Sequence, residues 1–501
     1  MTPPDMRLSY TLRNIVIPYN RIVRSAIKDA NKGNIQSVLK KIQVAANLQY
    51  NVNNLYADQR IEKLISVLSS EMLPTYENYT PTKGKILFYD YYGISNRGLT
   101  QQYLDALYQD KDLEIVYVVE NSFTERTENI LRMVRSHGSK CYELTQGGTM
   151  LEKIKTLYGI VKEERPSAIF YHISPWSPVP LIATKPFNSV KKYLINITDH
   201  AFGLGDGHFF DYSFEFREYG CKVSMEKRNY KRDQLKLLPY YPWQEQTGFQ
   251  GFPIDTTNKV VLFSGAYMYK IENPENTFFN IVARILKANP NTVMLFAGGG
   301  DPTRLQGLIE EQGLSDRFVL LGNRTDISEV FKHIDIYIGT YPHAGGLMSQ
   351  YAAINGKPIL AYKTHNIEKI VCNRNWMDFV FDSEEDLIEE ATHLASDKKY
   401  RELRGLMFQS LTATQDDFRQ SFNQLFSTSE CMNTDIDEQI DYDAFCQTYI
   451  DRINMAKNCG LEHQILRTCP YALHWKMLLN MMLNDIIAKK ILKKNENKKI
   501  A

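Results

Sequence analysis

The chain of 501 residues lacks the features that mark several specialised classes of protein. Its seven cysteines are odd in number and form no C-x-x-C pair, so neither a disulfide scaffold nor a cysteine-ligated zinc site is expected. Lysine and arginine (59) balance aspartate and glutamate (58), which gives no support for binding to nucleic acid. No apolar run approaches the roughly 20 residues that cross a bilayer, and no signal-peptide pattern opens the chain. Without a disulfide framework, the cysteines are expected to be reduced. Together these absences predict a cytoplasmic protein, at most peripheral to the inner face of a membrane.

The patterns along the chain predict a helical N-terminal extension and two α/β regions. Residues 1–80 contain no strand run, and the apolar spacing at 25–46 and 55–70 is that of amphipathic helices. From residue 85 to 245, short β-rich apolar runs alternate with helical patterns, and residues 255–400 repeat this alternation. Such runs, separated by helices, are typical of parallel sheets that are buried on both faces.

The two regions are separated by a Pro- and Gly-containing stretch at 239–253, and residues 401–501 look helical again. We therefore expect an α/β protein with two Rossmann-like domains that face a cleft, and with helical extensions at both ends. A hinge between two such domains is typical of enzymes that use nucleotides.

The usual nucleotide and metal fingerprints are missing. No G-x-G-x-x-G follows the first predicted strand, which disfavours a dehydrogenase. Residues 93–100 have the spacing of a P-loop, but Leu99 stands where the lysine would be, so Gly98 marks either a backbone approach to a ligand or an ordinary turn. The acidic D-x-D pairs at 435–437 and 441–443 have polar flanks, so we expect no metal site.

A glycine pair in the second region has a more informative setting. A predicted strand at 334–340 leads into a loop with Pro342, His343, Gly345 and Gly346, and a helix of small residues follows. Glycines at a helix start leave unpaired N–H groups facing outward, and the helix dipole adds partial positive charge there. This combination predicts a binding site, or seat, for a diphosphate at the start of the helix, although an ordinary turn would have the same sequence.

The surrounding residues resemble a known family. DIYIGTYPHAGG over 335–346, followed by GKPI over 356–359, resembles the donor-binding half of GT-B fold glycosyltransferases of the bacterial polysaccharide type (group 1, family-four-like). The strand TVMLFAGGGD at 292–301 and the segment INITDHAFGLGDGHFFDYSFEFRE at 195–218 are also similar to parts of these enzymes. The resemblance covers about residues 85–400 and leaves both ends uncovered.

The resemblance implies an enzyme that moves a sugar from a nucleotide-sugar, expected to be a UDP-sugar, to the hydroxyl of a saccharide or glycolipid acceptor. It also implies assembly of surface polysaccharide or glycoconjugate, with no metal and no cofactor beyond the donor. The donor would bind the second domain. The residues expected to hold it are Gly345, Gly346, His343, Lys270, Arg324, Ser349, Tyr351 and Gly98. The chain departs from the family at Tyr351, where many members have a glutamate, and at Ala266, where many have an arginine.

Asp199 and His200 are the candidate catalytic residues, because they follow the carboxyl end of a predicted first-domain strand. His200 would take the proton of the acceptor hydroxyl, with Asp199 orienting the ring or acting as the base itself. A capping aspartate beside a packed histidine is the structural alternative. Arg217 and Arg228 are weaker candidates for binding an anionic acceptor.

Three alternatives stay open. A nucleotide-sugar 2-epimerase would share this architecture and would turn over its substrate without an acceptor. A non-catalytic nucleotide-sugar-binding scaffold would bind the donor and transfer nothing. The apolar segment 473–492, which carries Lys489, Lys490, Lys493 and Lys494 at its end, is either a helix that closes the two domains or a peripheral contact with an anionic membrane.

Overall fold

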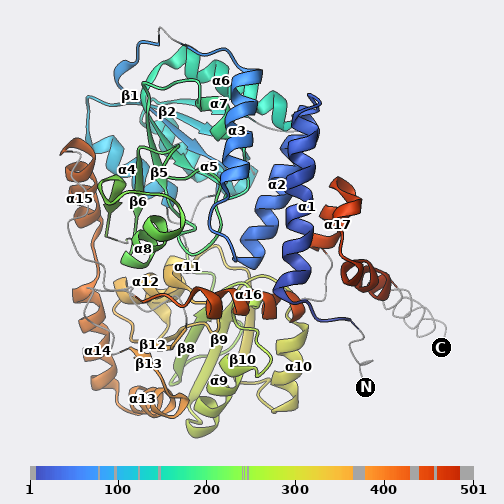
Figure 1. The fold of residues 1–501 in the computed structure, drawn as a ribbon. Coiled ribbons are helices and arrows are strands. Elements are labelled where there is room, and N and C mark those ends of the chain that lie inside the picture. The colour runs from blue at the N-terminus through green and yellow to red at the C-terminus, as the bar shows by residue number, and fades with distance from the viewer. Residues whose placement is uncertain are drawn as a thin grey trace, which may run out of the picture.

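The computed structural model describes residues 7–76, 79–94, 99–121, 124–144, 148–239, 241, 243–244, 248–364, 379–428, 439–455 and 460–485. Two parallel sheets, one above the other in Figure 1, form the centres of two α/β units. The expected fold class is therefore confirmed, with Rossmann-like sheets and helices at both ends of the chain.

The first sheet has seven strands in the order β3-β2-β1-β4-β5-β6-β7. The strands are β1 (Thr82–Asp90), β2 (Glu114–Val119), β3 (Lys140–Glu143), β4 (Pro166–His172), β5 (Lys191–Ile195), β6 (Tyr212–Glu215) and β7 (Leu235–Leu237). The helices between them are α4 (Leu99–Gln109), α5 (Thr124–Ser136), α6 (Met150–Glu164), α7 (Val179–Thr184) and α8 (Glu218–Lys227). Leu87, Phe88 and Tyr89 of β1 are fully buried, which is why the central strand reads as a continuous apolar run.

The second sheet has six strands in the order β10-β9-β8-β11-β12-β13. The strands are β8 (Val260–Gly265), β9 (Thr292–Ala297), β10 (Phe318–Gly322), β11 (Ile336–Ile338), β12 (Ile359–Tyr362) and β13 (Val380–Phe381). The helices are α9 (Thr277–Ala288), α10 (Thr303–Glu311), α11 (Ile327–Val330) and α12 (Gly346–Ile354). The strand order reverses between β1 and β4 in the first sheet and between β8 and β11 in the second. Ligands of open α/β sheets bind outside the carboxyl ends of the strands at such points.

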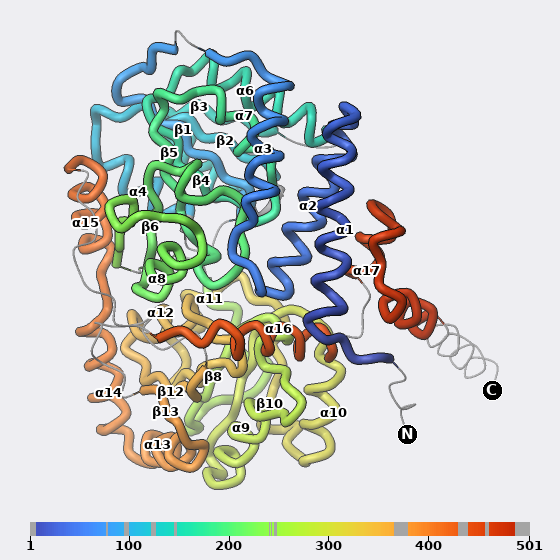
Figure 2. Tube along the Cα trace, in the orientation of Figure 1, coloured from blue at the N-terminus to red at the C-terminus, as the bar shows by residue number. Residues whose placement is uncertain are grey.

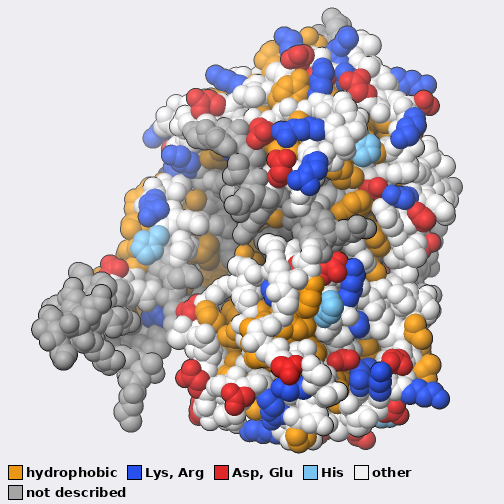
Figure 3. All heavy atoms as spheres, turned by 180° about the vertical axis from the view of Figure 1, so that it is seen from behind, with side chains coloured by type: hydrophobic (Ala, Val, Ile, Leu, Met, Phe, Trp, Pro, Cys, Tyr) orange, Lys and Arg blue, Asp and Glu red, His pale blue; other side chains and the backbone are white. Residues whose placement is uncertain are grey.

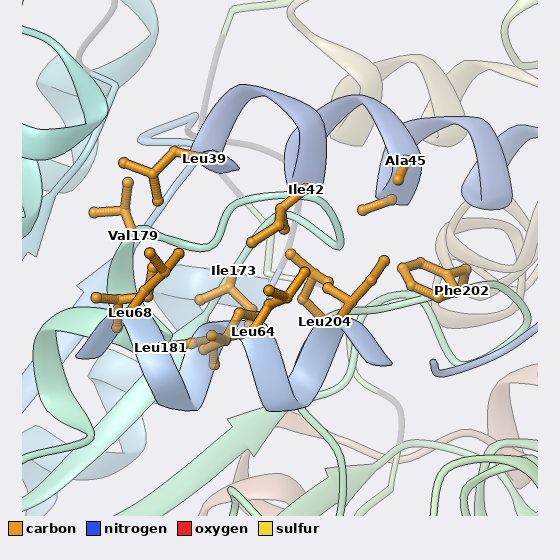
Figure 4. Close-up of a cluster of buried hydrophobic side chains, with 14 of the residues drawn as sticks. Leu39, Ile42, Ala45, Leu64, Leu68, Ile173, Val179, Leu181, Phe202 and Leu204 are labelled. Carbon is orange, nitrogen blue, oxygen red and sulfur yellow. The ribbon is translucent and has the colours of Figure 1, made fainter. Parts of the chain in front are cut away.

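The N-terminal extension folds onto the first domain. It consists of α1 (Leu12–Ala30), α2 (Ile35–Val52) and α3 (Gln59–Met72). The single helix expected over 25–46 is wrong, because the chain turns at Gly33 with a φ of 71°, a left-handed conformation that glycine adopts readily. Figure 4 shows Leu39 and Ile42 of α2, with Leu64 of α3, packed against Ile173 and other buried first-domain side chains.

The C-terminal region returns from the second domain to the first along one side of the molecule (Figure 2). Its helices are α13 (Glu384–Ser396), α14 (Lys398–Leu411), α15 (Gln415–Thr428), α16 (Tyr442–Met455) and α17 (Gly460–Thr468). Phe418 and Phe422 of α15 are buried in the core around the first sheet. The Arg419 guanidinium donates two hydrogen bonds, of 2.6 and 2.8 Å, to the Asp105 carboxylate of α4. Helix α15 therefore packs on the first domain, whereas the preceding helix α14 contacts α12 of the second domain.

The last described helical stretch, 475–485, packs on the N-terminal extension rather than across the two domains. Its Asn480 side chain exchanges hydrogen bonds of 2.8 and 2.9 Å with the backbone of Leu8. Leu473 and Met477 join the core that α1 and α2 share with the first domain. Residues 489–494, with their four lysines, lie outside the described part of the chain.

No helix among the described residues is long and apolar enough to cross a bilayer. Seen from behind, acidic and basic side chains intermingle over the visible face of the molecule (Figure 3). The near-zero net charge of the sequence is therefore reflected in a mixed surface on this face.

Candidate functional site

A cavity of about 130 Å³ lies between the two domains and is lined by both. The first domain contributes Ile197, Asp199, His200, Phe216 and Arg217, the second contributes Tyr269, Lys270, His343, Ala344, Gly346 and Leu347, and helix α16 contributes Tyr449. The lining segments follow β5, β6, β8 and β11, so they occupy the carboxyl ends of strands in both sheets. This is the position where open α/β sheets bind ligands.

The first-domain wall is built around the Asp199 carboxylate, which is fully buried. Arg217 donates two hydrogen bonds to it, and the one from Nη2 to Oδ1 measures 2.8 Å. Burial alone would raise the pKa of Asp199, but the charge and hydrogen bonds of Arg217, together with His200, hold that pKa well below its ordinary value. Asp199 is therefore a carboxylate at neutral pH.

His200 stands next to this carboxylate, with Nδ1 3.2 Å from Oδ1 of Asp199 and 28% of its side chain exposed. Because an ionised carboxylate only accepts hydrogen bonds, Nδ1 carries the proton and Nε2 is left as an acceptor. Burial within the cleft lowers the pKa of His200 below its ordinary value, against the opposing effect of Asp199. A neutral imidazole in this tautomer has the form that a general base needs.

The loop that carries these residues is held from behind by Arg228, which is 2% exposed. Its guanidinium donates to the backbone carbonyls of Thr198, at 2.6 Å, and Ala201. The extension adds a bond of 2.8 Å from Asn53 Nδ2 to the His200 carbonyl. Arg228 therefore supports the loop that carries Asp199 and His200, and it does not line the cavity as an acceptor-binding residue would.

The second-domain wall is formed by the loop between β11 and α12. Gly345 is the N-cap of α12 and Gly346 is its first residue, so the first N–H groups of the helix have no intrahelical partner. A Cβ at Gly345 would lie 3.3 Å from Oγ1 of Thr340, which leaves little room for a side chain. The X-Pro bond between Tyr341 and Pro342 is cis.

Lys270 and His343 flank this helix start. Lys270 Nζ donates to the Ala344 carbonyl at 3.0 Å, which places an ammonium group beside the glycine pair. The His343 ring is buried, and among the described residues its Nε2 atom has no hydrogen-bond partner. Burial and the positive charges of Arg452, Lys270 and His200 hold the pKa of His343 well below its ordinary value. The wall thus presents one cation, one unpartnered neutral imidazole nitrogen and the positive end of a helix.

The remaining predicted donor residues lie elsewhere. Arg324 is committed to Asp326, with two hydrogen bonds of 2.7 Å, and to the Gly251 carbonyl at 2.8 Å. The Tyr351 hydroxyl donates to the Trp243 carbonyl at 2.7 Å, and Ser349 is buried behind the start of α12. None of these three is among the described residues that line the cavity, and Gly98 lies outside the described residues.

A second Asp–His pair, which the sequence did not single out, lies at the reversal point of the first sheet. His172 Nδ1, at the end of β4, is 2.9 Å from Oδ1 of Asp90 at the end of β1. Thr100 and Tyr117 donate to the other carboxylate oxygen at 3.0 and 2.8 Å. Asp90 and His172 are the last residues of β1 and β4, and in the sequence they are polar residues near the ends of two apolar runs, which is the signal that could have indicated them.

Metal ligands were expected to be absent. Of the two acidic pairs, 435–437 lies outside the described residues. The Asp441 side chain caps α16 by accepting from the Ala444 N–H at 2.9 Å. Among the described residues, no group of three His, Cys, Asp or Glu side chains is arranged to hold a metal ion.

Residues 244–404 match the model of the family Glycosyl transferases group 1. No protein of curated function matches the chain at a significant level. Among solved structures, a mutant of S. aureus TarM in complex with Fondaparinux, α-GlcNAc-glycerol and UDP has 9% identity and a TM-score of 0.51, over 69% of this chain and 100% of that one. Anabaena HepE in complex with UDP and glucose has 14% identity and a TM-score of 0.51, over 69% and 99%. A mutant of Thermobaculum terrenum O-GlcNAc transferase has 15% identity and a TM-score of 0.50, over 86% and 83%.

The structural likenesses are those of the GT-B fold, and the family match falls on the second domain. The chain therefore has the GT-B fold, and residues 244–404, which hold its second sheet, match the family Glycosyl transferases group 1. The resemblance stated from the glycine-pair segment is confirmed, and the matched range contains Lys270, His343, Gly345 and Gly346.

Proposed function

We propose that this glycosyltransferase moves a hexosyl group from a UDP-sugar to a hydroxyl of a saccharide or glycolipid acceptor, in the assembly of surface polysaccharide or another glycoconjugate. The observation that carries the proposal is the shared cavity, in which a neutral His200 on one domain faces Lys270, His343 and the start of α12 on the other. HepE and TarM were solved with UDP, which supports UDP as the nucleotide.

In the proposed reaction the diphosphate of the donor lies against the N–H groups of Gly346 and its neighbours. As the bond between the anomeric carbon and the phosphate oxygen breaks, negative charge grows on the leaving UDP. Lys270 and the helix dipole stabilise that charge, and His343 Nε2 offers a further polar contact. Because these groups are in place before the reaction, no metal ion and no cofactor beyond the donor are required.

The acceptor hydroxyl forms the new bond to the anomeric carbon and loses its proton to His200 Nε2. Asp199 keeps the imidazole in the required tautomer and stabilises the imidazolium that forms. Arg217 in turn fixes the Asp199 carboxylate. The His172–Asp90 pair is the second candidate for this proton transfer, because it occupies the reversal point of the same sheet.

We further propose that the enzyme works in the cytoplasm and touches an anionic membrane through its C-terminal end. Cys141, Cys221, Cys446 and Cys469 are free thiols, as in a reducing compartment. On the stretch 475–485, Trp475 and Met482 are 59% and 62% exposed, and the lysine-rich residues 489–494 follow in the sequence. Exposed apolar and aromatic side chains beside lysines are typical of helices that lie on membrane surfaces.

A ligand screen tests the proposal. The free protein is heated with UDP, other nucleoside diphosphates and a panel of nucleotide-sugars, and UDP release is then followed with saccharide acceptors. A donor at 100 times its dissociation constant adds about 2.7 kcal/mol to the free energy of unfolding, so it raises the melting temperature clearly. Binding of UDP-sugars with acceptor-dependent release of UDP supports transfer. Turnover without an acceptor indicates an epimerase, and binding without turnover indicates a scaffold.

A further inference from the structure

Helix α16 forms a third wall of the interdomain cavity. It lies between the two domains in Figures 1 and 2, although its residues stand outside the range 244–404 that matches the family. Tyr449 of this helix lines the same cavity as His200 and Gly346. This wall is therefore built by residues outside the matched range.

Two aromatic rings on one face of α16 reach the histidines of the opposite walls. The ring of Phe445 lies 6.4 Å, centroid to centroid, from the ring of His200. One turn later, the ring of Tyr449 lies 5.2 Å from the ring of His343, in an edge-to-face arrangement. The centroids of the two aromatic rings are 5.1 Å apart. Helix α16 therefore extends from His200 on the first domain to His343 on the second.

The helix is held firmly in this position. The Arg452 guanidinium lies 4.7 Å over the Tyr449 ring and 4.9 Å over the Tyr269 ring, and it donates to the Asn51 side chain at 3.0 Å. The Asn454 side chain pairs with the backbone of Tyr10 through bonds of 2.6 and 3.0 Å. The N-terminal extension thus fixes α16, which keeps Tyr449 oriented before any substrate binds.

Tyr449 lines the cavity between the proposed sites of the diphosphate and of the acceptor oxygen. If the diphosphate lies at Gly346 and the acceptor oxygen at His200, the sugar ring must lie between them, in the space that Tyr449 borders. The Tyr449 hydroxyl makes no hydrogen bond to another described residue, so it can bond to a sugar hydroxyl. Burial raises the pKa of Tyr449 well above its ordinary value, which keeps this hydroxyl a donor.

We propose that Tyr449 contacts the hexosyl group of the donor and selects which sugar is transferred. The proposal rests on the proposed function. Its ring packs against the apolar face of the sugar, and its hydroxyl bonds to one sugar hydroxyl. A pocket that hydrogen-bonds a substrate hydroxyl discriminates strongly against sugars in which that group is missing or inverted.

The experiment compares Tyr449→Phe and Tyr449→Ala with the unmodified enzyme and with Tyr442→Phe. Tyr442 is a matched control on the same helix, because its hydroxyl bonds to Glu226 at 2.7 Å and it does not line the cavity. For each protein, kcat/KM is measured for UDP-glucose, UDP-galactose and UDP-N-acetylglucosamine, the Kd of UDP is measured by calorimetry, and KM is measured for the acceptor.

We expect Tyr449→Phe to lower the preference for the best donor over the others by about tenfold, the effect of one lost hydrogen bond. Tyr449→Ala should lower it further, and the Kd of UDP should stay within about twofold in all variants. If Tyr449→Phe has the same donor preference as the unmodified enzyme, the proposal is overturned, even if the alanine variant does not fold. A changed acceptor KM with an unchanged donor preference assigns Tyr449 to the acceptor and also overturns it. If the unmodified enzyme turns over no UDP-sugar, the proposed function fails first, and this assignment fails with it.

Discussion

The Nδ1 atom of His200 lies 3.2 Å from Oδ1 of Asp199, in a cavity whose other wall belongs to the second domain. Asp199 is fully buried and is also bonded to Arg217. A histidine that carries its proton on Nδ1 and lines the cavity between the domains is suited to accept a proton on Nε2. The two residues follow β5 closely in the sequence, and the proposed role of His200 as general base depends on this pairing.

His200→Ala should lower kcat by about 10²–10⁴, the usual effect of losing a general base. The Kd of UDP should barely change, because the proposed binding site of the nucleotide lies on the second domain. His137→Ala, at an exposed position far along the chain from the cleft, serves as the control. If His200→Ala keeps near-normal kcat, the pair is structural, and His172→Ala becomes the variant to measure.

Asp199→Asn should have two effects. It should slow turnover less than His200→Ala if Asp199 only orients the ring, and more if Asp199 is itself the base. It should also lower the free energy of unfolding by about 3–5 kcal/mol, because Arg217 is left buried without its partner charge. Urea unfolding separates the two effects. Unchanged stability would contradict the buried ion pair.

The pH dependence follows from the lowered pKa values of His200 and His343. In the unfolded chain both histidines bind a proton below about pH 6.5. The folded protein binds these protons only at lower pH, so its stability falls as the pH drops below about 6.5. Urea unfolding at pH 7.5 and pH 5.5 should show a smaller loss for His343→Gln than for the unmodified protein. The exposed His333→Gln should behave like the unmodified protein, and equal losses for all three would contradict the account.

Gly346→Val tests the diphosphate seat. A branched side chain at the first residue of α12 would occupy the space in which the diphosphate approaches the N–H groups, so the Kd of UDP should rise at least about tenfold while the fold survives. Gly307→Val is the matched control, because a Cβ at this helical glycine meets no atom within 4 Å. Unchanged UDP binding by a folded Gly346→Val variant would place the seat elsewhere.

Membrane contact can be tested by co-sedimentation with vesicles that contain anionic lipid. Replacing Trp475 with serine should lower the bound fraction, because an exposed aromatic side chain near lysines contributes to surface binding. Leu406→Ser on α14 is the control, since Leu406 is 58% exposed but lies on the second-domain side of the molecule. Equal binding by both variants and the unmodified protein would exclude this surface.

Much of the fold could be predicted from the sequence, because most strands are apolar runs buried on both faces. Within the alternation predicted for residues 255–400, the apolar run at 259–266 is β8 and the helical pattern at 275–288 is α9. Two short edge strands, β3 with the sequence KCYE and β7 with the sequence LKL, carry too few apolar residues to be recognised. Their place in the sheet is decided by pairing with β2 and β6.

The site could be predicted in part, for a geometric reason. Asp199 and His343 both follow strands, and the carboxyl ends of parallel strands gather at one edge, so both reach the cleft. Arg324 does not reach the cleft, because the carboxylate of Asp326, two residues away, accepts hydrogen bonds from its guanidinium. Tyr449 could not be predicted as a residue of the cleft, because α16 lies about a hundred residues beyond the glycine pair. No local pattern in the sequence indicates that this helix returns to the cleft.

The most direct test of the account is release of UDP from UDP-sugars, measured with and without saccharide acceptors in excess chelator. The account predicts release that depends on both donor and acceptor, that persists in the chelator and that is lost in His200→Ala. Release without an acceptor, release that disappears in the chelator and returns with manganese, or the absence of any release from a protein that binds UDP would contradict it.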